Sequence, residues 1–279
     1  ILQVSHCVAE AEAVRLAAEA RADAAINSVV SEIAQEADVV SQAIDEATAR
    51  EAERLIQVEY ELIDPIHDMR EGLEDSEEPI HDRGDYHIGE SNVQKRVFQE
   101  FGDVEGMKEN SVASHKKNWI FAGVNHAFTE PHAVVAHWEP TGRLTLYTPQ
   151  QVPHYVHRAL ADVLEIPMHQ INVHRTFVGG GFGGKSDPFP HEMCAAILAR
   201  KSGKPVRITF DREEVYWVNR GRHPSRIEMN LHADGQGRIC GIETDALIDG
   251  GAFASFGHVT TYYNGVLHTA PYEIGAFHY

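Results

Sequence analysis

Cysteine, long apolar runs and an excess of positive charge are all lacking in this chain of 279 residues. Its three cysteines, Cys7, Cys194 and Cys240, lie far apart, which excludes a disulfide scaffold and any CxxC-type zinc or iron–sulfur site within the chain. We therefore expect a reducing, cytoplasmic setting. Because no apolar run approaches the roughly 20 residues that a membrane-spanning helix needs, the sequence predicts no such helix.

Negative charge is concentrated in one part of the sequence. Residues 1–110 hold 27 Asp and Glu against 9 Lys and Arg, whereas residues 111–279 hold 15 of each, so the net charge of −18 belongs to the first part. Nucleic-acid binding needs a basic face and is therefore excluded. We interpret the acidic part as a solvated surface with a charged loop. A non-catalytic acidic interaction module on an α/β fold is an open alternative.

Local patterns divide the chain into three segments. Residues 1–55 contain neither glycine nor proline and favour helices, of which 45–55 is the clearest. Residues 56–61 alternate like a strand, and we expect them to complete a small α/β domain over residues 1–65. The charged residues 66–97 predict an acidic linker. Residues 98–279 predict a mixed domain, and the fold class we expect is α+β.

The third segment contains both strand and helix patterns. Pro153 opens an amphipathic helix, and a second helix is predicted from a cap at Asp187 to its end at Gly203. A turn is expected at 140–142 and a hairpin turn at 233–237. Strands are predicted at 119–121, 133–138, 143–147, 171–178, 206–210, 227–232 and 238–248.

The most informative stretch is VGGGFGGKS, residues 178–186. Gly179, Gly184, Lys185 and Ser186 match the phosphate-binding pattern G-x-x-x-x-G-K-[ST], which would indicate a P-loop nucleotide hydrolase with Asp211 as its Mg²⁺ aspartate. Prolines at 188 and 190 oppose this, because the helix of a P-loop starts at the lysine and continues unbroken. The P-loop hydrolase nevertheless stays open as an alternative.

Glycines around a single phenylalanine suit close approach to a ligand. Glycine tolerates φ > 0 and brings the backbone within contact distance of a bound group, while Phe182 would present a flat ring. Successive backbone N–H groups in such a turn form a site for an anion or an oxo group. A tight strand–helix turn with Phe182 packed in the core is the structural alternative.

Several segments, in order and spacing, resemble the molybdenum-binding large subunit of the xanthine oxidase and aldehyde oxidoreductase family. The resemblance covers roughly residues 45–279, and residues 249–265 are most similar to 4-hydroxybenzoyl-CoA reductases. Residues 1–44 depart from the family's opening strand and loop. The segments that carry the resemblance are 79–105, 126–132, 148–153, 179–185, 202–214 and 221–224.

The resemblance implies a hammerhead-like first domain over 1–65, an acidic linker over 66–97, and the first portion of a molybdopterin-binding domain over 98–279. It implies the molybdenum cofactor, with iron–sulfur clusters and FAD on partner subunits. The family's catalytic glutamate and second glycine-rich loop would lie beyond Tyr279. No catalytic residue is therefore expected in this chain, and the remainder of the molybdenum subunit becomes an implied partner.

By the same resemblance, the cofactor would be contacted by Gln151 and by Gly181, Phe182, Gly183 and Gly184 of the glycine-rich loop. Gln151 would donate its amide to an oxygen on the metal, Gly183 would offer a backbone N–H, and the ring of Phe182 would lie beside the substrate.

Substrate class is inferred from residues that differ from the purine-oxidising members. Ser186 stands where those members carry a glutamate, and a later loop carries Tyr262 and Tyr263 instead of an arginine. Two tyrosines suit an aromatic ring with one polar substituent. We expect hydroxylation or reductive dehydroxylation of an aromatic or aldehyde substrate, with a 4-hydroxybenzoyl-CoA-like one favoured. The alternative is that the tyrosines belong to the core.

Eighteen histidines raise the question of a metal site. His154 and His157 lie one helical turn apart, but no third ligand stands at a suitable spacing. We expect no metal ligand from the protein, because the resemblance implies that a pterin holds the molybdenum.

Overall fold

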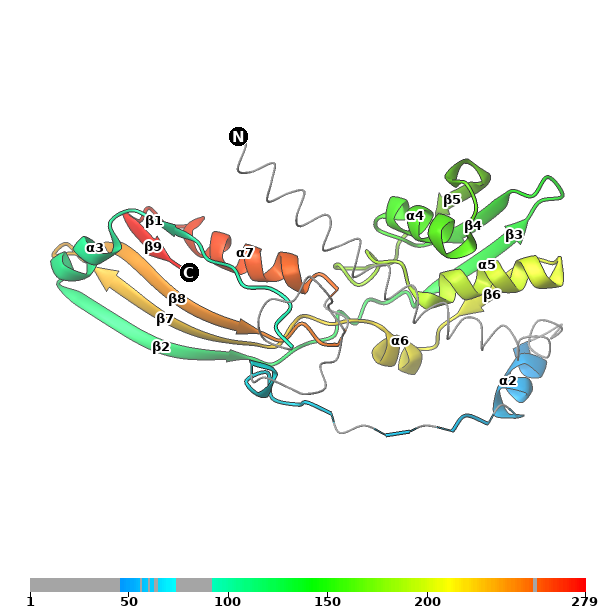
Figure 1. The fold of residues 1–279 in the computed structure, drawn as a ribbon, viewed down its shortest axis with the longest axis horizontal. Coiled ribbons are helices and arrows are strands. Elements are labelled where there is room, and N and C mark those ends of the chain that lie inside the picture. Colours follow the sequence, from blue (N-terminus) through cyan, green and yellow to red (C-terminus); the bar gives the residue numbers. More distant parts are fainter. Residues whose placement is uncertain (1–45, 56, 60, 63–64, 74–91, 253–254) are drawn as a thin grey trace. The chain divides into compact units, whose positions relative to one another are not determined.

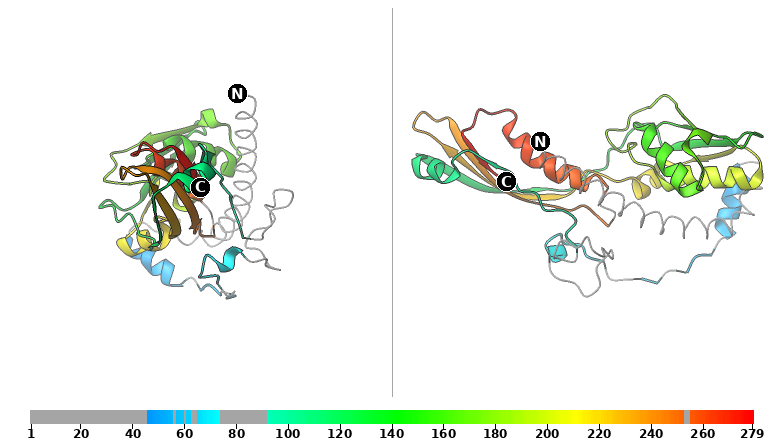
Figure 2. Two further views of the ribbon diagram at one scale, coloured as in Figure 1. Left: turned by 90° about the vertical axis from the view of Figure 1, so that its left-hand side faces the viewer. Right: turned by 45° about the horizontal axis from the view of Figure 1, so that its top comes forward.

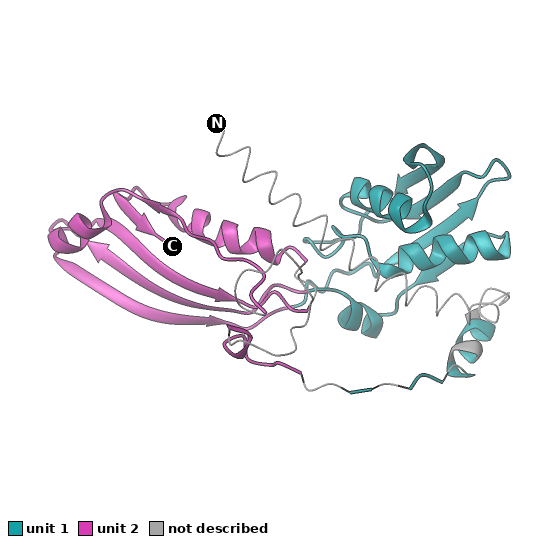
Figure 3. Cartoon of the chain, in the orientation of Figure 1, with its two compact units in different colours: residues 1–62, 125–220 teal, residues 63–124, 221–279 magenta. Residues whose placement is uncertain are grey.

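The computed structural model describes residues 46–55, 57–59, 61–62, 65–73, 92–252 and 255–279. The chain divides into two compact units (Figure 3). Unit 1 comprises residues 1–62 and 125–220, and unit 2 comprises 63–124 and 221–279. Residues 125–220 are thus inserted into the sequence of unit 2, and both units draw on residues 98–279. Most of the expected domain over 1–65 lies outside the described residues, so that domain stays a prediction.

Unit 1 contains a four-stranded mixed sheet with the order β5-β4-β3-β6 (Figure 1). β3 runs antiparallel to both β4 and β6, whereas β4 and β5 are parallel. The β3–β4 hairpin turns at Gly142, whose φ of 81° belongs to the left-handed region that glycine tolerates. The strands are β3 Ala133–Trp138, β4 Leu144–Thr148, β5 Ile171–Arg175 and β6 Val206–Thr209.

Helices α4 (Pro153–Leu164) and α5 (Pro190–Ser202) pack on this sheet (Figure 2). α4 supplies the crossover that a parallel strand pair such as β4–β5 requires. α5 ends at Gly203 in a left-handed conformation, as predicted. The predicted cap at Asp187 is wrong, because Pro188 and Pro190 delay the helix and Phe189 becomes its cap residue. α2 (Glu46–Leu55), η3 (Met168–Gln170) and α6 (Arg212–Val218) complete the described elements of unit 1.

One apolar core holds unit 1 together. Alternate residues of β3 and β4 face the apolar sides of α4 and α5, so the strand period of two meets the helix period of 3.6 at one interface. Eight of its members are completely buried: Ala136, Leu144, Leu146, Val156, Leu160, Ala195, Ala196 and Ala199.

Unit 2 is built on a five-stranded sheet with the order β1-β9-β8-β7-β2. β8 and β9 are parallel, and the other neighbours are antiparallel. The long helix α7 (Gly257–Thr269) lies along this sheet (Figure 2), where Tyr279 donates its hydroxyl to the carbonyl oxygen of Thr261 at 2.9 Å. The other elements are η1 Glu71–Leu73, β1 Glu100–Phe101, α3 Val104–Asn110, β2 Ala113–Phe121, β7 Ser225–Ala233, β8 Ile239–Ile248 and β9 Ala276–His278.

The inserted residues leave and rejoin unit 2 at two points that are far apart in the sequence but paired in the structure. Val124 and Arg222 form an isolated antiparallel bridge, in which the N–H of Arg222 donates to the carbonyl oxygen of Val124 at 2.7 Å. This bridge closes the two halves of unit 2 at the end of the β2–β7 pair.

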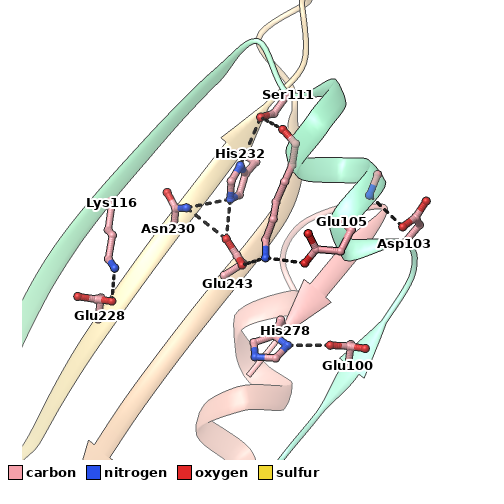
Figure 4. Close-up of polar contacts among 12 residues, drawn as sticks. Glu100, Asp103, Glu105, Ser111, Lys116, Glu228, Asn230, His232, Glu243 and His278 are labelled. Carbon is pink, nitrogen blue, oxygen red and sulfur yellow. Dashed lines mark hydrogen bonds and ion pairs between the residues drawn. The ribbon is translucent and has the colours of Figure 1, made fainter.

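The interior of unit 2 is smaller than that of unit 1. Its buried apolar residues form two clusters of three, and every residue of the edge strand β2 is exposed. Polar contacts supplement these clusters (Figure 4). Glu243 on β8 accepts from Lys108 of α3 and contacts Nε2 of His232, which reaches Ser111 through its other ring nitrogen.

The α+β fold class is confirmed, as are the helix at 46–55 and seven strands at the predicted places, although β5 ends at Arg175 instead of residue 178. The short strands β1 and β9 were not predicted. The predicted strand over 56–61 is wrong, because the described residues of that segment pair with no other strand. Alternation alone therefore does not specify a strand when nothing lies beside it. The tyrosines expected in a later loop lie on helix α7.

Candidate functional site

The glycine loop, residues 179–185, connects β5 to α5 in unit 1 and has an unusual backbone. Gly180, Phe182 and Gly183 have φ values of 95°, 52° and 94°. A left-handed conformation costs a non-glycine residue on the order of 1–3 kcal/mol. The Phe182 side chain, in addition, is 66% exposed. The alternative in which this ring packs in the core is wrong, and the strain at Phe182 indicates a functional loop.

Gln151 binds two backbone amides of the glycine loop through one side-chain oxygen. Its Oε1 accepts hydrogen bonds from the N–H of Gly183 at 3.0 Å and of Lys185 at 3.2 Å. A Cβ on Gly181 would lie 2.3 Å from this oxygen, so only glycine fits there. Oε1 makes both of these contacts. The Nε2 donor of Gln151 has no partner among the described residues. The structure thus brings Gln151 and the predicted loop residues together.

Lys185 turns inward instead of toward solvent. Its side chain is 1% exposed, and its Nζ lies 2.6 Å from Oε2 of Glu130 and 4.7 Å from the ring centroid of Phe128. Burial lowers the pKa of Lys185, although the hydrogen bond to Glu130 opposes this effect. The same Glu130 oxygen accepts the N–H of Gly179 at 2.8 Å.

Two more side chains hold carbonyl groups of the loop. Nη2 of Arg220 donates to the oxygen of Gly183 at 2.9 Å, and Nε2 of His132 lies 3.3 Å from the oxygen of Gly184. Arg220 also pairs with Asp187, and burial lowers its pKa to about 10. Burial lowers the pKa of His132 to about 4, and the Lys185 charge adds to this effect, so His132 is neutral at pH 7.

A buried carboxyl group supports the approach to the loop. Glu192 is completely buried and accepts from the hydroxyl of Thr148 at 2.7 Å, the amide of Gln150 at 3.0 Å and the N–H of Phe189 at 3.1 Å. Burial raises the pKa of Glu192 to about 7 despite these donors. Sequence patterns did not reveal Glu192 or His132, because their roles depend on contacts across the fold.

The backbone donors left over define what the loop can bind. Among the described residues, the N–H groups of Gly180, Gly181 and Phe182 have no hydrogen-bond partner, whereas those of Gly179, Gly183, Gly184 and Lys185 are used internally. Successive free N–H groups around a left-handed residue form a concave anion-binding surface. Together with Nε2 of Gln151 they suit an oxygen-rich ligand.

The same geometry overturns the P-loop alternative. The helix after the loop begins at Pro190 instead of at Lys185, and the lysine that would reach a phosphate is buried against Glu130. Two of the amides that would cradle a phosphate donate to Gln151. The match of residues 179–186 to the phosphate-binding pattern is therefore coincidental.

Tyr262 and Tyr263 belong to unit 2, whereas Gln151 and the glycine loop belong to unit 1. Both tyrosines are 52% exposed on α7, which contradicts the core alternative, and their ring centroids are 5.9 Å apart. Tyr262 lines a groove of about 640 Å³ whose other apolar walls are Phe98, Phe101, Val266 and Phe277.

The remaining candidates stay apart from this site. His154 is exposed, and Nε2 of His157 contacts the oxygen of Met168 at 2.8 Å. In the described part of the chain, no three His, Cys, Asp or Glu residues are placed to hold a metal ion. None of the described helices is long and apolar enough to cross a membrane.

Comparison with known proteins gives one family and several relatives. The family model of the molybdopterin cofactor-binding domain matches residues 87–279. The chain is 30% identical over 214 residues to the xanthine dehydrogenase molybdenum-binding subunit of Escherichia coli O157:H7, covering 77% of this chain and 28% of that protein. It is also 30% identical over 224 residues to the nicotinate dehydrogenase large molybdopterin subunit of Eubacterium barkeri, covering 80% and 49%.

Solved structures share the fold. Quinoline 2-oxidoreductase from Pseudomonas putida 86 matches with a TM-score of 0.62 at 30% identity, covering 73% of this chain and 25% of that one. Aldehyde oxidoreductase from Desulfovibrio gigas matches with a TM-score of 0.71 at 21% identity, covering 85% and 25%, and shows the fold alone. The chain spans from a quarter to a half of the length of these proteins.

Proposed function

Because this chain belongs to the molybdopterin cofactor-binding domain family of the xanthine oxidase type, we propose that it forms part of the molybdenum subunit of an oxidoreductase. The observation that carries the proposal is the glycine loop itself. It combines a strained backbone with three N–H groups and one side-chain amide, that of Gln151, which have no partner among the described residues. Such neutral donors suit the oxygen atoms of a molybdenum–pterin group, which supplies the redox chemistry when bound.

The residues of the loop take different roles in this proposal. Nε2 of Gln151 donates to an oxygen of the cofactor, and the N–H of Phe182 supplies a backbone donor. The N–H of Gly183, expected at this position from the sequence, already binds Gln151. Gly181 and Gly184 act through the absence of a side chain, since a Cβ would lie 2.3 Å from Gln151 and 2.8 Å from Phe128. The exposed ring of Phe182 borders the substrate.

For the substrate we propose an aromatic or aldehyde compound that is hydroxylated or reductively dehydroxylated. Relatives named for xanthine, nicotinate and quinoline support an aromatic ring. The side chain of Ser186 is nearly buried and offers no carboxylate to a purine. Tyr262 and Tyr263 offer exposed rings and hydroxyl groups, which favours a 4-hydroxybenzoyl-CoA-like substrate.

The proposal includes partners and a location. Electrons would pass through an iron–sulfur subunit and a flavin subunit, and the remainder of the molybdenum subunit would supply the catalytic glutamate. We place the assembled enzyme in the cytoplasm, where free Cys194 and Cys240 stay reduced.

Two substitutions of Gln151 test the cofactor role in the assembled enzyme. Gln151→Glu keeps the oxygen that binds the loop but removes the Nε2 donor, whereas Gln151→Ala removes both. Losing one donor to a charged oxygen should lower turnover by about 10²–10³-fold. Gln236→Ala, an exposed glutamine in the β7–β8 turn, is the matched control.

Molybdenum and pterin content per chain are measured beside turnover. We expect wild-type protein and the Gln236→Ala variant to contain the cofactor and the Gln151 variants to lose turnover. Wild-type enzyme without molybdenum and pterin would contradict the function. Full turnover in Gln151→Glu would contradict the role of this residue only.

A further inference from the structure

We propose that Glu130 is a positioning residue that clasps both ends of the glycine loop, so that one carboxylate oxygen sets the loop's cofactor-binding shape. The inference rests on the proposed function and adds a residue to it. Oε2 of Glu130 accepts from the N–H of Gly179, the first residue of the loop, and from Nζ of Lys185, the last. No other described side chain binds both ends of the loop.

Burial makes the Lys185 contact obligatory. An ammonium group removed from water is strongly destabilising unless a charged partner and hydrogen bonds compensate for it. Lys185 is 1% exposed and lies over the ring of Phe128, where Glu130 is the carboxylate that it contacts. If Glu130 were neutral, Lys185 would have to lose its proton or leave its buried position, and a side chain that left would move the chain on either side of it.

At the other end of the loop, Glu130 and Gly179 are joined by two hydrogen bonds, one donated by each residue. The N–H of Gly179 donates to Glu130, and the N–H of Glu130 donates to the carbonyl oxygen of Gly179 at 3.2 Å. A Cβ on Gly179 would lie 2.6 Å from that of Glu130, so the pair needs glycine at this position. These contacts therefore hold Glu130 and the first residue of the loop in one fixed relative position.

The segment that carries Glu130 is itself held in place. Arg212, at the start of α6, donates from Nη1 to the oxygen of Phe128 at 2.8 Å and from Nη2 to that of Thr129 at 2.7 Å. The clasp is thus anchored to a helix rather than to the loop. Glu130 can thereby hold Gly179 and Lys185 in place. Through Lys185 it also positions the backbone N–H of that residue, which Gln151 binds.

The experiment uses the full chain in the assembled enzyme and in cofactor-free form. Glu130→Gln keeps the shape of the side chain and removes its charge. A double variant, Glu130→Gln with Lys185→Met, also removes the buried ammonium while filling the space over Phe128. Glu139→Gln is the control, since Glu139 accepts two hydrogen bonds at the far end of β3.

Amide hydrogen exchange is measured first at the four hydrogen-bonded amides of the loop, because it needs no cofactor. These are the amides of Gly179, Gly183, Gly184 and Lys185. Glu130→Gln should raise exchange there by about tenfold or more, the effect of losing a hydrogen bond to a charged group. Exchange in β3, β4 and α5 should stay at the wild-type rate. Uniformly faster exchange across unit 1, or an unchanged loop, would overturn the positioning role.

Molybdenum and pterin content are measured next. We expect Glu130→Gln to lower both by about tenfold and the double variant to restore both, along with loop protection. A double variant with a protected loop but no cofactor would overturn the proposal, because Lys185 would then be needed directly. Wild-type enzyme without cofactor would contradict the proposed function, whereas the exchange data would still decide the clasp.

Discussion

Unit 1 buries its charged side chains more deeply than unit 2 does. Unit 1 encloses Lys185, Glu192 and much of Arg220, and satisfies each with specific partners. In unit 2 the ion pairs are more exposed, as between Lys116 and Glu228, and the carboxylate of its most buried pair, His232 with Glu243, keeps 22% of its side chain exposed. A buried charge is tolerated only where the surroundings fix its partner, which demands a well-packed core. The large apolar core of unit 1 meets that demand, and the two small clusters of unit 2 do not.

This difference in packing explains why the strained glycine loop occurs in unit 1. A strained loop such as 179–185 persists only when the structure around it determines its shape. Unit 1 supplies Gln151, Glu130, His132 and Arg220 for this purpose. Unit 2 instead presents open surface, including a fully exposed edge strand and the groove beside Tyr262.

The largest expected effect tests the difference between the cores. Leu146→Ala, at a completely buried position of unit 1, should lower the free energy of unfolding of that unit by about 2–5 kcal/mol. Ile242→Ala in unit 2 should cost less, because half-buried neighbours and water can fill the space that it leaves. Hydrogen exchange resolved by unit measures both. Equal losses would break the comparison.

The second prediction concerns a buried histidine of unit 1. His191 lies among the rings of Phe210 and Phe189, and neither ring nitrogen has a partner among the described residues. Burial, with a contribution from His132, lowers the pKa of His191 to about 3. Its unfolded pKa is about 6.5, so the stability that its neutral form contributes is present above pH 6.5 and is lost as pH falls toward 3.

His191→Phe should therefore stabilise unit 1 by about 1–3 kcal/mol at pH 7, because two unsatisfied nitrogens are removed. Its advantage over wild type should grow as pH falls below 6.5, by about 1.4 kcal/mol per pH unit. Denaturant unfolding of both proteins between pH 5 and 8 measures this difference. An advantage that shrinks on acidification would show that His191 is charged in the folded protein.

The third prediction compares helix caps, one in each unit. Asp211 accepts the N–H of Glu214 at 2.8 Å in unit 1, and Asp103 accepts that of Gly106 at 2.9 Å in unit 2. Replacing either by Ala should cost about 1 kcal/mol, because both caps are exposed and local. Thermal unfolding of the two variants should give similar shifts for the affected unit. A much larger loss of stability for the Asp211 variant would mean that the contribution of a helix cap also depends on the core behind it.

The smallest effect is expected from a surface ion pair of unit 2. Lys116 on β2 and Glu228 on β7 are diagonal neighbours on adjacent strands, and their side chains are 58% and 41% exposed. Glu228→Gln should change the free energy of unfolding by less than about 0.5 kcal/mol. Urea titrations at low and high salt measure it. A loss as large as that expected for Leu146→Ala would remove the distinction between the units.

Local pattern predicted much of the fold and only part of the site. Strand β3 occupies the predicted residues 133–138, because alternation and a turn at Gly142 are local signals. The glycine loop was also evident, since few other sequences permit such a backbone. The cap at Asp187 was wrong because Pro188 and Pro190 delay the start of the helix, and the Asp187 side chain pairs with Arg220 instead.

The supporting residues of the site could not be found from spacing. Glu130, His132 and Glu192 lie many positions from the residues that they contact, and their importance depends on burial. Tyr262 and Tyr263 were predicted as substrate-binding residues of a loop, and that role stays a prediction. Their helix was not predicted, because TTYYN has weak helix propensity. Tertiary packing decided these cases.

The bridge between Val124 and Arg222 bears on how the chain folds. While residues 125–220 are unfolded, pairing β2 with β7 must close a long, flexible loop, at a cost in chain entropy. Once the insert has folded, its two ends are held within one hydrogen bond of each other, and that cost falls. The unit that carries the glycine loop is therefore also the one that brings together the two distant halves of unit 2. A variant that slows the folding of the insert should delay the folding of both units.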